Sequence, residues 1–118
     1  MSAHNFREMV IWKDSIDMVK NIYTICAEFP VREKYGIVSQ LQRAAVSISA
    51  NIAEGSGRSS DADFKRFFSF SVGSAYELET LVTIAKEVGY LEEENCFNLT
   101  EKLQHLQKMI CKFSRQLQ

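Results

Sequence analysis

The chain has 118 residues, enough for one domain with a hydrophobic core, and its 46% apolar and 25% charged residues are typical of a globular protein. Its 14 basic and 15 acidic residues give a formal net charge of -1, which excludes a general attraction to nucleic acid or anionic membranes. The N-terminus lacks the apolar stretch of a signal peptide, and no apolar run approaches the roughly 18–20 residues that span a bilayer, so we expect a cytoplasmic protein without membrane association.

The first predicted helix covers residues 8–29 and follows a short tail, residues 1–7, that we expect to be disordered or to dock. Pro30 ends it, because proline disfavours the helical conformation of the residue before it. Two adjacent apolar stripes run along this helix and make more than half of its circumference apolar. The stripes consist of Met9, Trp12, Ile16, Val19, Tyr23 and Cys26, and of Ile11, Met18, Ile22, Ile25 and Phe29.

The second predicted helix covers residues 32–54, with Gly36 tolerated near its start and Gly55-Ser56-Gly57 as its stop. Its apolar stripe consists of Ile37, Leu41, Ala44, Ile48 and Ile52. Six residues of this helix have small side chains, so we expect a neighbouring helix to approach closely; they are Ala44, Ala45, Ser47, Ser49, Ala50 and Ala53.

The third predicted helix covers residues 60–88, with a capping box from Ser60 to Asp63 and Gly89 at its end. Its apolar surface is again wider than one face and includes Phe64, Phe67, Phe68, Phe70, Ala75, Leu78, Leu81, Val82, Ile84, Ala85 and Val88. The fourth covers residues 93–117 and has a narrow stripe: Leu99, Leu103, Leu106, Ile110, Phe113 and Leu117.

Four helices of similar length joined by short loops predict an all-α, up-down-up-down antiparallel four-helix bundle, forming a single domain over residues 1–118. The first and third helices carry more apolar surface than one bundle core needs. Contact between subunits is the simplest way to bury that surplus, so we expect a homo-oligomer. The odd number of cysteines (Cys26, Cys96 and Cys111), all in half-apolar helical segments, favours buried reduced thiols over a disulfide.

A polar stripe runs directly beside the apolar stripe of the second helix. An ordinary solvated face would lie on the opposite side of the helix. It consists of Gln40, Arg43, Ser47, Asn51 and Glu54. One interpretation is a structural network in which Arg43 pairs with Glu54 or with Glu77 of the third helix. The other is a site for a ligand or for RNA.

Basic residues cluster in two places: Arg58, Lys65 and Arg66 around the start of the third helix, and Lys108, Lys112 and Arg115 on one flank of the fourth. Solvated cations explain both clusters, and lysine or arginine near a helix C-terminus also interacts favourably with the helix dipole. The functional alternative is a surface that contacts phosphates, with binding that weakens as salt rises.

Motifs for catalysis, cofactors and metals are missing, so we predict no catalytic, cofactor-binding or metal-binding residues and no enzyme. The segment from Gly55 to Ser60 lacks the lysine of a phosphate-binding loop and the third glycine of a dinucleotide motif. A di-iron bundle needs Glu-x-x-His on two helices, whereas Glu101 and His105 have the wrong spacing and His4 is the only other histidine.

The chain resembles a bacterial family named for open reading frames in the intervening sequences of 23S ribosomal RNA genes. The resemblance covers about residues 6–115 and rests on a combination of short motifs. These motifs are Trp12-Lys13, Phe29-Pro30, Glu33-Lys34-Tyr35-Gly36, Gln40-Leu41-Gln42-Arg43-Ala44-Ala45-Val46-Ser47-Ile48, Asn51-Ile52-Ala53-Glu54-Gly55, Gly73-Ser74-x-x-Glu77-Leu78-Glu79 and Gly89-Tyr90.

The resemblance implies a homopentameric bundle without established enzymatic activity. It also implies kinship with the accessory variability determinant of diversity-generating retroelements, a basic pentamer that binds nucleic acid and a reverse transcriptase. The matching polar positions are Gln40, Arg43, Ser47, Asn51, Glu54, Ser74 and Glu77. We therefore expect a self-associating scaffold that contacts RNA, DNA or a reverse transcriptase-like protein, the alternative being a purely structural protein–protein adaptor.

Overall fold

The structure, a computed structural model, describes residues 5–117; residues 1–4, with His4 and most of the expected N-terminal tail, and residue 118 lie outside the described residues. Four long helices form it, with two short 3-10 helices, η1 (Phe6–Glu8) and η2 (Val31–Glu33). The long helices are α1 (Val10–Cys26), α2 (Ile37–Ser56), α3 (Asp61–Glu87) and α4 (Glu93–Arg115). No strand occurs between residues 5 and 117, and the predicted all-α fold class is confirmed.

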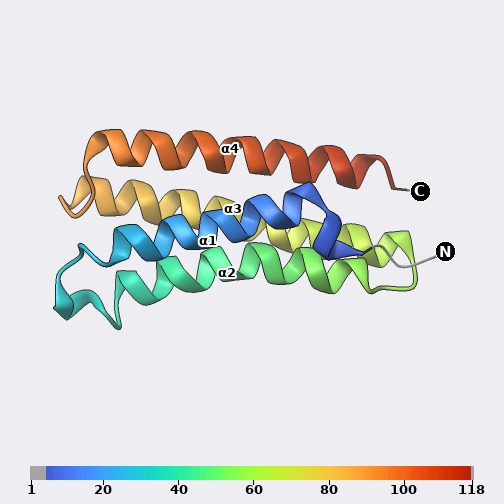
Figure 1. Cartoon of the computed structure of the whole chain (residues 1–118), viewed down its shortest axis with the longest axis horizontal. Coiled ribbons are helices and arrows are strands. Elements are labelled where there is room, and N and C mark those ends of the chain that lie inside the picture. The colour runs from blue at the N-terminus through green and yellow to red at the C-terminus, as the bar shows by residue number, and fades with distance from the viewer. Residues whose placement is uncertain (1–4, 118) are drawn as a thin grey trace.

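The helices form a four-helix bundle about 47 Å long, in which consecutive helices run in opposite directions (Figure 1). Each helix packs against its neighbours in the chain, and α1 also packs against α4, so the four surround one core. Both ends of the described chain lie at the same end of the bundle (Figure 1). None of the helices within residues 5–117 has the length and apolarity that crossing a bilayer requires.

The α1–α2 connection differs from the prediction, because α1 ends at Cys26 and α2 begins only at Ile37. The amide of Phe29 donates to the carbonyl of Cys26 at 3.1 Å, which closes a turn before Pro30. Gly36, which we expected inside the second helix, instead precedes α2 as its N-cap residue.

The other helix ends lie closer to the predictions. The amide of Asp63 donates to the hydroxyl of Ser60 at 3.1 Å, which confirms the expected cap of α3. Gly89 has a φ of +89°, a left-handed conformation that suits glycine at the end of a helix. The fourth helix ends at Arg115, two residues before the expected end.

The core contains one full stripe from every helix, and α2 and α3 are in close contact at Gly55. A Cβ atom on Gly55 would lie 2.9 Å from the Cβ of Phe67 and 3.0 Å from Cδ1 of Phe64. Deeper in the same interface, the buried Ser71 hydroxyl donates to the carbonyl of Ile48 at 2.8 Å. The small residues of α2 therefore do what the sequence predicts: they let α3 pack close.

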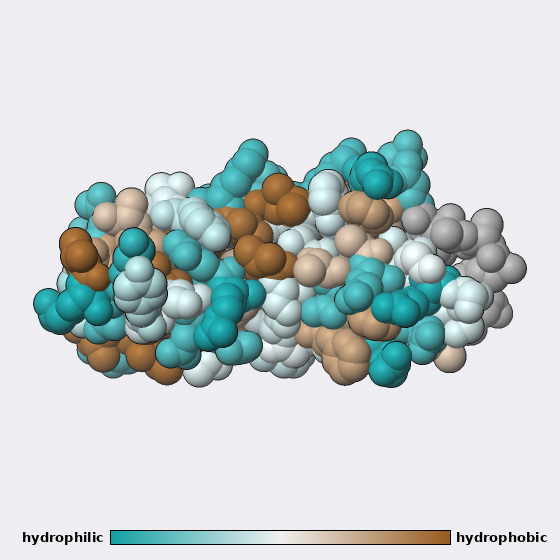
Figure 2. All heavy atoms as spheres, turned by 90° about the horizontal axis from the view of Figure 1, so that it is seen from below, coloured by the Kyte–Doolittle hydropathy of each residue, from teal (hydrophilic) through white to brown (hydrophobic). Residues whose placement is uncertain are grey.

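Large apolar side chains also remain at the surface of the subunit. On α3 they are Phe70, Tyr76, Ile84 and Val88, which are 47%, 56%, 43% and 57% exposed; Tyr23 on α1 and Val46 on α2 are 49% and 44% exposed. Figure 2 shows such hydrophobic side chains gathered among hydrophilic ones on the face seen from below. The third helix thus has the extra apolar surface that its sequence pattern indicates.

Candidate functional site

The middle of the predicted polar stripe forms a hydrogen-bonded network between α2 and α3. The side-chain amide of Asn51 donates to the carbonyl of Ser47 at 2.9 Å and to its hydroxyl oxygen at 3.0 Å. The hydroxyl of Ser74, across the interface, donates to the same hydroxyl oxygen at 2.8 Å. All three side chains are half-buried, so this part of the stripe joins two helices.

The remaining residues of the stripe lie apart from this network. The side chains of Gln40, Arg43 and Glu77 are exposed and make no hydrogen bond or ion pair within residues 5–117. Glu54 pairs with Arg58, one helical turn later, at 3.5 Å. The single subunit therefore contains neither pair that we considered for Arg43.

At the start of α3, two of the three predicted basic residues converge on one aromatic ring. The guanidinium groups of Arg58 and Arg66 lie 4.3 Å and 5.3 Å from the centre of the Phe67 ring. Arg66 also pairs with Asp63 at 3.4 Å. The side chain of Lys65 makes no hydrogen bond or ion pair with any described residue and does not join this cluster.

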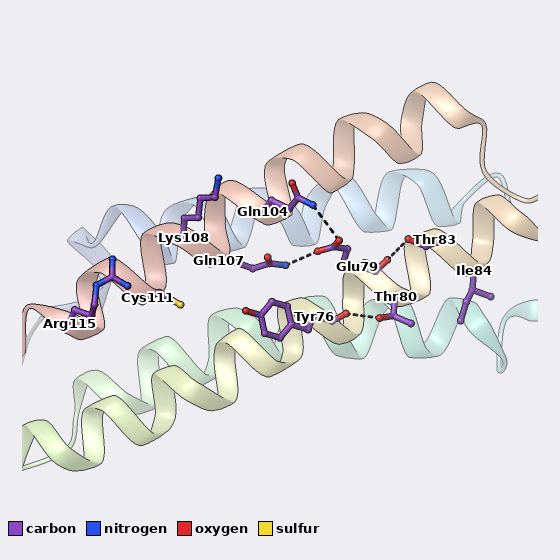
Figure 3. A pocket seen from close by; sticks show the side chains of 10 residues that line it. All are labelled: Tyr76, Glu79, Thr80, Thr83, Ile84, Gln104, Gln107, Lys108, Cys111 and Arg115. Atoms are coloured by element: carbon purple, nitrogen blue, oxygen red, sulfur yellow. Dashed lines mark hydrogen bonds between the residues drawn. The ribbon is translucent and has the colours of Figure 1, made fainter.

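Two residues of the other predicted basic cluster line an open groove of about 780 Å³ between α3 and α4 (Figure 3). Lys108 and Arg115 come from α4, whereas the exposed Lys112 does not line the groove. The groove is lined by Tyr76, Glu79, Thr80, Thr83, Ile84, Gln104, Gln107, Lys108, Cys111 and Arg115. Two cations, an aromatic ring and several polar side chains thus line this groove.

A carboxylate spans the middle of this groove and is held by two amides. Oε1 of Glu79 accepts a hydrogen bond from Nε2 of Gln107 at 3.0 Å, and Oε2 accepts one from Nε2 of Gln104 at 3.5 Å. Figure 3 shows Glu79 and Gln107 pointing toward each other between the two helices. Sequence reasoning missed Tyr76, Glu79 and both glutamines, although the glutamines continue the periodic spacing of Lys108 and Arg115 along α4.

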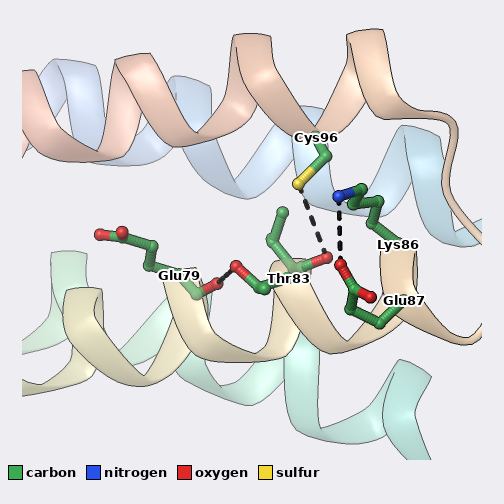
Figure 4. A network of polar contacts seen from close by, with 6 residues as sticks. Glu79, Thr83, Lys86, Glu87 and Cys96 are labelled. Carbon is green, nitrogen blue, oxygen red and sulfur yellow. Dashed lines mark hydrogen bonds and ion pairs between the residues drawn. The ribbon is translucent and has the colours of Figure 1, made fainter.

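A second group of polar contacts lies near the α3–α4 loop, outside the groove (Figure 4). The thiol of the buried Cys96 lies 4.0 Å from the carbonyl of Val82, and Nζ of Lys86 lies 3.1 Å from Oε2 of Glu87. The hydrogen bond that Lys86 donates to Glu87 raises the pKa of Lys86. The contact between Cys96 and Val82 joins α4 to α3, whereas the pair of Lys86 and Glu87 lies within α3.

All three cysteines are free thiols, with Cys26 and Cys96 buried and Cys111 half-buried in the α3–α4 groove. Burial raises the pKa of Cys26 to about 11, so its thiol stays protonated and poorly nucleophilic at neutral pH. The residues that the structure describes contain no group of three or more histidine, cysteine, aspartate or glutamate side chains placed to hold a metal ion.

The groove on the other side of α4 has the opposite charge. It lies between α1 and α4, measures about 390 Å³ and is lined by Asp14, Asp17 and Glu101, with Lys102 as its one cation. The α3–α4 groove has two cations and a single carboxylate. A chain with almost no net charge therefore presents one acidic and one basic groove, on either side of the same helix.

Comparisons with known proteins find a family match and a structural match. The sequence profile described as 23S rRNA-intervening sequence protein matches residues 7–112. A crystal structure of a protein with unknown function from the S23 ribosomal protein family of Bacteroides thetaiotaomicron superimposes with a TM-score of 0.81. The two chains are 22% identical over 89% of this chain and 98% of that one, a likeness that shows a shared fold. No curated protein matches the chain significantly.

Proposed function

The chain belongs to the 23S rRNA-intervening sequence protein family, and from that premise we propose that it is a cytoplasmic, non-enzymatic, self-associating bundle that contacts nucleic acid through its α3–α4 side. The opposite charge of the two grooves beside α4 carries this proposal. Phosphates are repelled by Asp14, Asp17 and Glu101 on one side and attracted by Lys108 and Arg115 on the other. The bundle can thus orient on a polyanion without a basic net charge.

The cations on this side are available to a partner. Lys108, Lys112 and Arg115 are exposed and form no ion pair with any other described residue. Contacts between such cations and phosphates release counterions, so the affinity falls steeply with salt. Arg58 and Arg66 extend the basic surface at the same end of the bundle, although each already has a carboxylate partner.

Self-association is supported by exposed apolar residues outside the α3–α4 groove: Phe70 on α3, Val88 directly after it, and Tyr23 and Val46 on α1 and α2. A ring of copies hides such surface and repeats each weak phosphate contact, which increases avidity. We propose the pentamer that the family resemblance implies, with RNA, DNA or a reverse transcriptase-like protein as its partner.

Mass measurement of the purified protein by light scattering, with and without RNA or DNA, tests the assembly and its partner together. We expect one oligomeric mass at micromolar concentration and a larger mass with nucleic acid at low salt. A monomer refutes the proposed assembly. An oligomer that binds neither RNA nor DNA at low salt refutes the nucleic-acid function and favours the protein–protein adaptor.

A pair of charge variants tests the surface itself. Replacing Lys108 and Arg115 by glutamine should weaken binding and reduce the slope of log affinity against log salt by about two, since each phosphate contact contributes about one. The matched control replaces Lys13 and Lys20, two exposed lysines of α1, and should change little. Equal effects of the two pairs contradict a contact surface at the α3–α4 groove.

A further inference from the structure

We propose that the α3–α4 groove holds one unpaired nucleobase, which stacks on Tyr76 and presents its polar edge to Glu79. This inference deepens the proposed function and rests on it. It names the ligand as single-stranded nucleic acid, with guanine as the preferred base. Three features of the groove support such a ligand: the exposed ring of Tyr76, the hydrogen-bond acceptors beside it and the cations farther along.

Tyr76 offers an aromatic ring that is more than half exposed. Its side chain is 56% exposed, its ring stacks on no other aromatic ring of residues 5–117, and its hydroxyl makes no hydrogen bond with those residues. It lines the groove between α3 and α4 (Figure 3). Aromatic side chains placed in this way are the usual stacking platforms for unpaired bases.

Hydrogen-bond acceptors predominate next to that ring. Glu79 lies three residues after Tyr76, and residues at this spacing are neighbours on one helix face. A carboxylate has about four acceptor positions, and Glu79 uses one on each oxygen for Gln104 and Gln107. The side-chain oxygens of these glutamines accept no hydrogen bond from described residues, so the groove favours a base edge that donates.

Guanine fits this edge better than the other bases. Its Watson–Crick edge has two adjacent donors, N1–H and the N2 amino group, which match the two oxygens of one carboxylate. Uracil has a single donor between two acceptors, and its acceptors would face the carboxylate of Glu79. Recognition of this edge requires an unpaired base, because pairing in a duplex already occupies it.

The cations of the groove lie where the sugar–phosphate backbone of a bound strand would leave the pocket. Lys108 and Arg115 follow Gln104 along the same flank of α4, one turn and three turns later. They can neutralise phosphates that flank the bound nucleotide, while the neutral Gln104 and Gln107 lie beside the base. The groove therefore offers cations for the phosphates in addition to the carboxylate and amides that would read the base.

Fluorescence anisotropy with short labelled RNAs tests the pocket in the full-length protein. The probes are an oligouridine, the same RNA with one central guanosine, that RNA with inosine in place of guanosine, and the guanosine RNA annealed to its complement. We expect the single-stranded guanosine RNA to bind most tightly. Inosine, which lacks the N2 amino group, and the duplex should each bind more weakly.

Substitutions separate stacking from edge recognition. Tyr76→Ala should weaken binding of the guanosine RNA roughly tenfold, the order of one stacking contact, whereas Tyr76→Phe should retain it. Glu79→Gln should remove the preference for guanosine over uridine. Tyr35→Ala, at a tyrosine of the α1–α2 connection that is 87% exposed, is the matched control and should leave binding unchanged.

These experiments distinguish failure of the base pocket from failure of the proposed nucleic-acid function. Absence of salt-sensitive binding to every probe overturns the proposed function and the pocket with it. Salt-sensitive binding that is equal for all probes and unaffected by Tyr76→Ala overturns only the pocket. Far-ultraviolet circular dichroism of each variant shows whether the bundle is intact, which an exposed position such as Tyr76 should allow.

Discussion

The hydroxyl of Tyr90 donates a hydrogen bond of 2.7 Å to Oε2 of Glu33 and so joins the two loops at one end of the bundle. The other oxygen of Glu33 accepts from the amide of Ile37 at 3.4 Å, where α2 begins. The ring of Tyr90 also packs on Phe29, with 5.5 Å between ring centres. One tyrosine of the α3–α4 connection thus stabilises the start of a distant helix.

Tyr90→Phe should destabilise the protein by about 1–2 kcal/mol, because it removes a half-buried hydrogen bond to a carboxylate. Urea unfolding measures the loss, and a double-mutant cycle with Glu33→Gln should show that the two effects are coupled. Tyr35→Phe makes the same chemical change at a tyrosine that is 87% exposed and should have almost no effect. Independent, additive effects of the Tyr90 and Glu33 substitutions would contradict this arrangement.

Gly55→Ala should destabilise the bundle by about 1–3 kcal/mol, the usual cost of overfilling a packed interface. The new Cβ atom meets Cβ of Phe67 at 2.9 Å and the backbone carbonyl of Phe64 at 3.3 Å, neither of which can rotate away. Gly73→Ala is the matched control within a helix. Its Cβ has nothing within 4 Å, so alanine should stabilise α3 by up to about 1 kcal/mol.

Thermal unfolding of both glycine variants gives the comparison directly. A lower melting temperature for Gly55→Ala and a higher one for Gly73→Ala are expected. A Gly55→Ala protein as stable as the parent would mean that α2 and α3 do not approach as closely as described.

Ser47→Ala should cost about 1 kcal/mol, because its hydroxyl oxygen accepts hydrogen bonds from both Asn51 and Ser74. Ser69→Ala, at an exposed serine of α3 with no hydrogen bond to the described residues, is the control. Chemical unfolding of both variants measures the difference. If the two substitutions have the same effect, the α2–α3 network does not contribute to stability.

Stability should decrease at alkaline pH partly because of Cys26. Burial raises the pKa of this thiol from 9.0 to about 11, so the folded state holds the proton more tightly than the unfolded state. The resulting stabilisation is complete below about pH 9 and is lost as pH rises toward 11, at no more than about 1.4 kcal/mol per pH unit.

Urea unfolding between about pH 8 and pH 10.5 tests this linkage against a Cys26→Ala variant. The variant should be less stable at neutral pH but should lose less stability as pH increases. Parallel pH profiles of the two proteins would show that the thiol does not titrate in a buried environment.

The sequence predicted those features that depend on one helix at a time. The stripes of α3, the Ser60 cap and the position of Ser47 and Asn51 on one flank of α2 follow from helical periodicity, and the structure contains each. The match of residues 7–112 confirms the family resemblance, which also supplied Ser74.

Features that depend on how two helices are placed against each other were not predictable in the same way. Arg43 and Glu54 share a flank of α2 but are eleven residues, or about 16 Å, apart along the axis, whereas Arg58 lies one turn from Glu54. The contact between Glu79 and Gln107 requires the register of α3 on α4. A register shift of one residue along α4 rotates the facing side chains by about 100° and so changes every contact across the interface.

Both ends of the described chain emerge beside the basic end of the bundle, and this affects how the protein should be labelled. A tag or fluorescent protein fused at either terminus would crowd Arg58 and Arg115, where it could screen their charges. The turn at Gly89 lies at the opposite end of a molecule about 47 Å long. A dye attached there reports on complexes from a distance, and an affinity tag at either terminus is best cleaved before RNA is added.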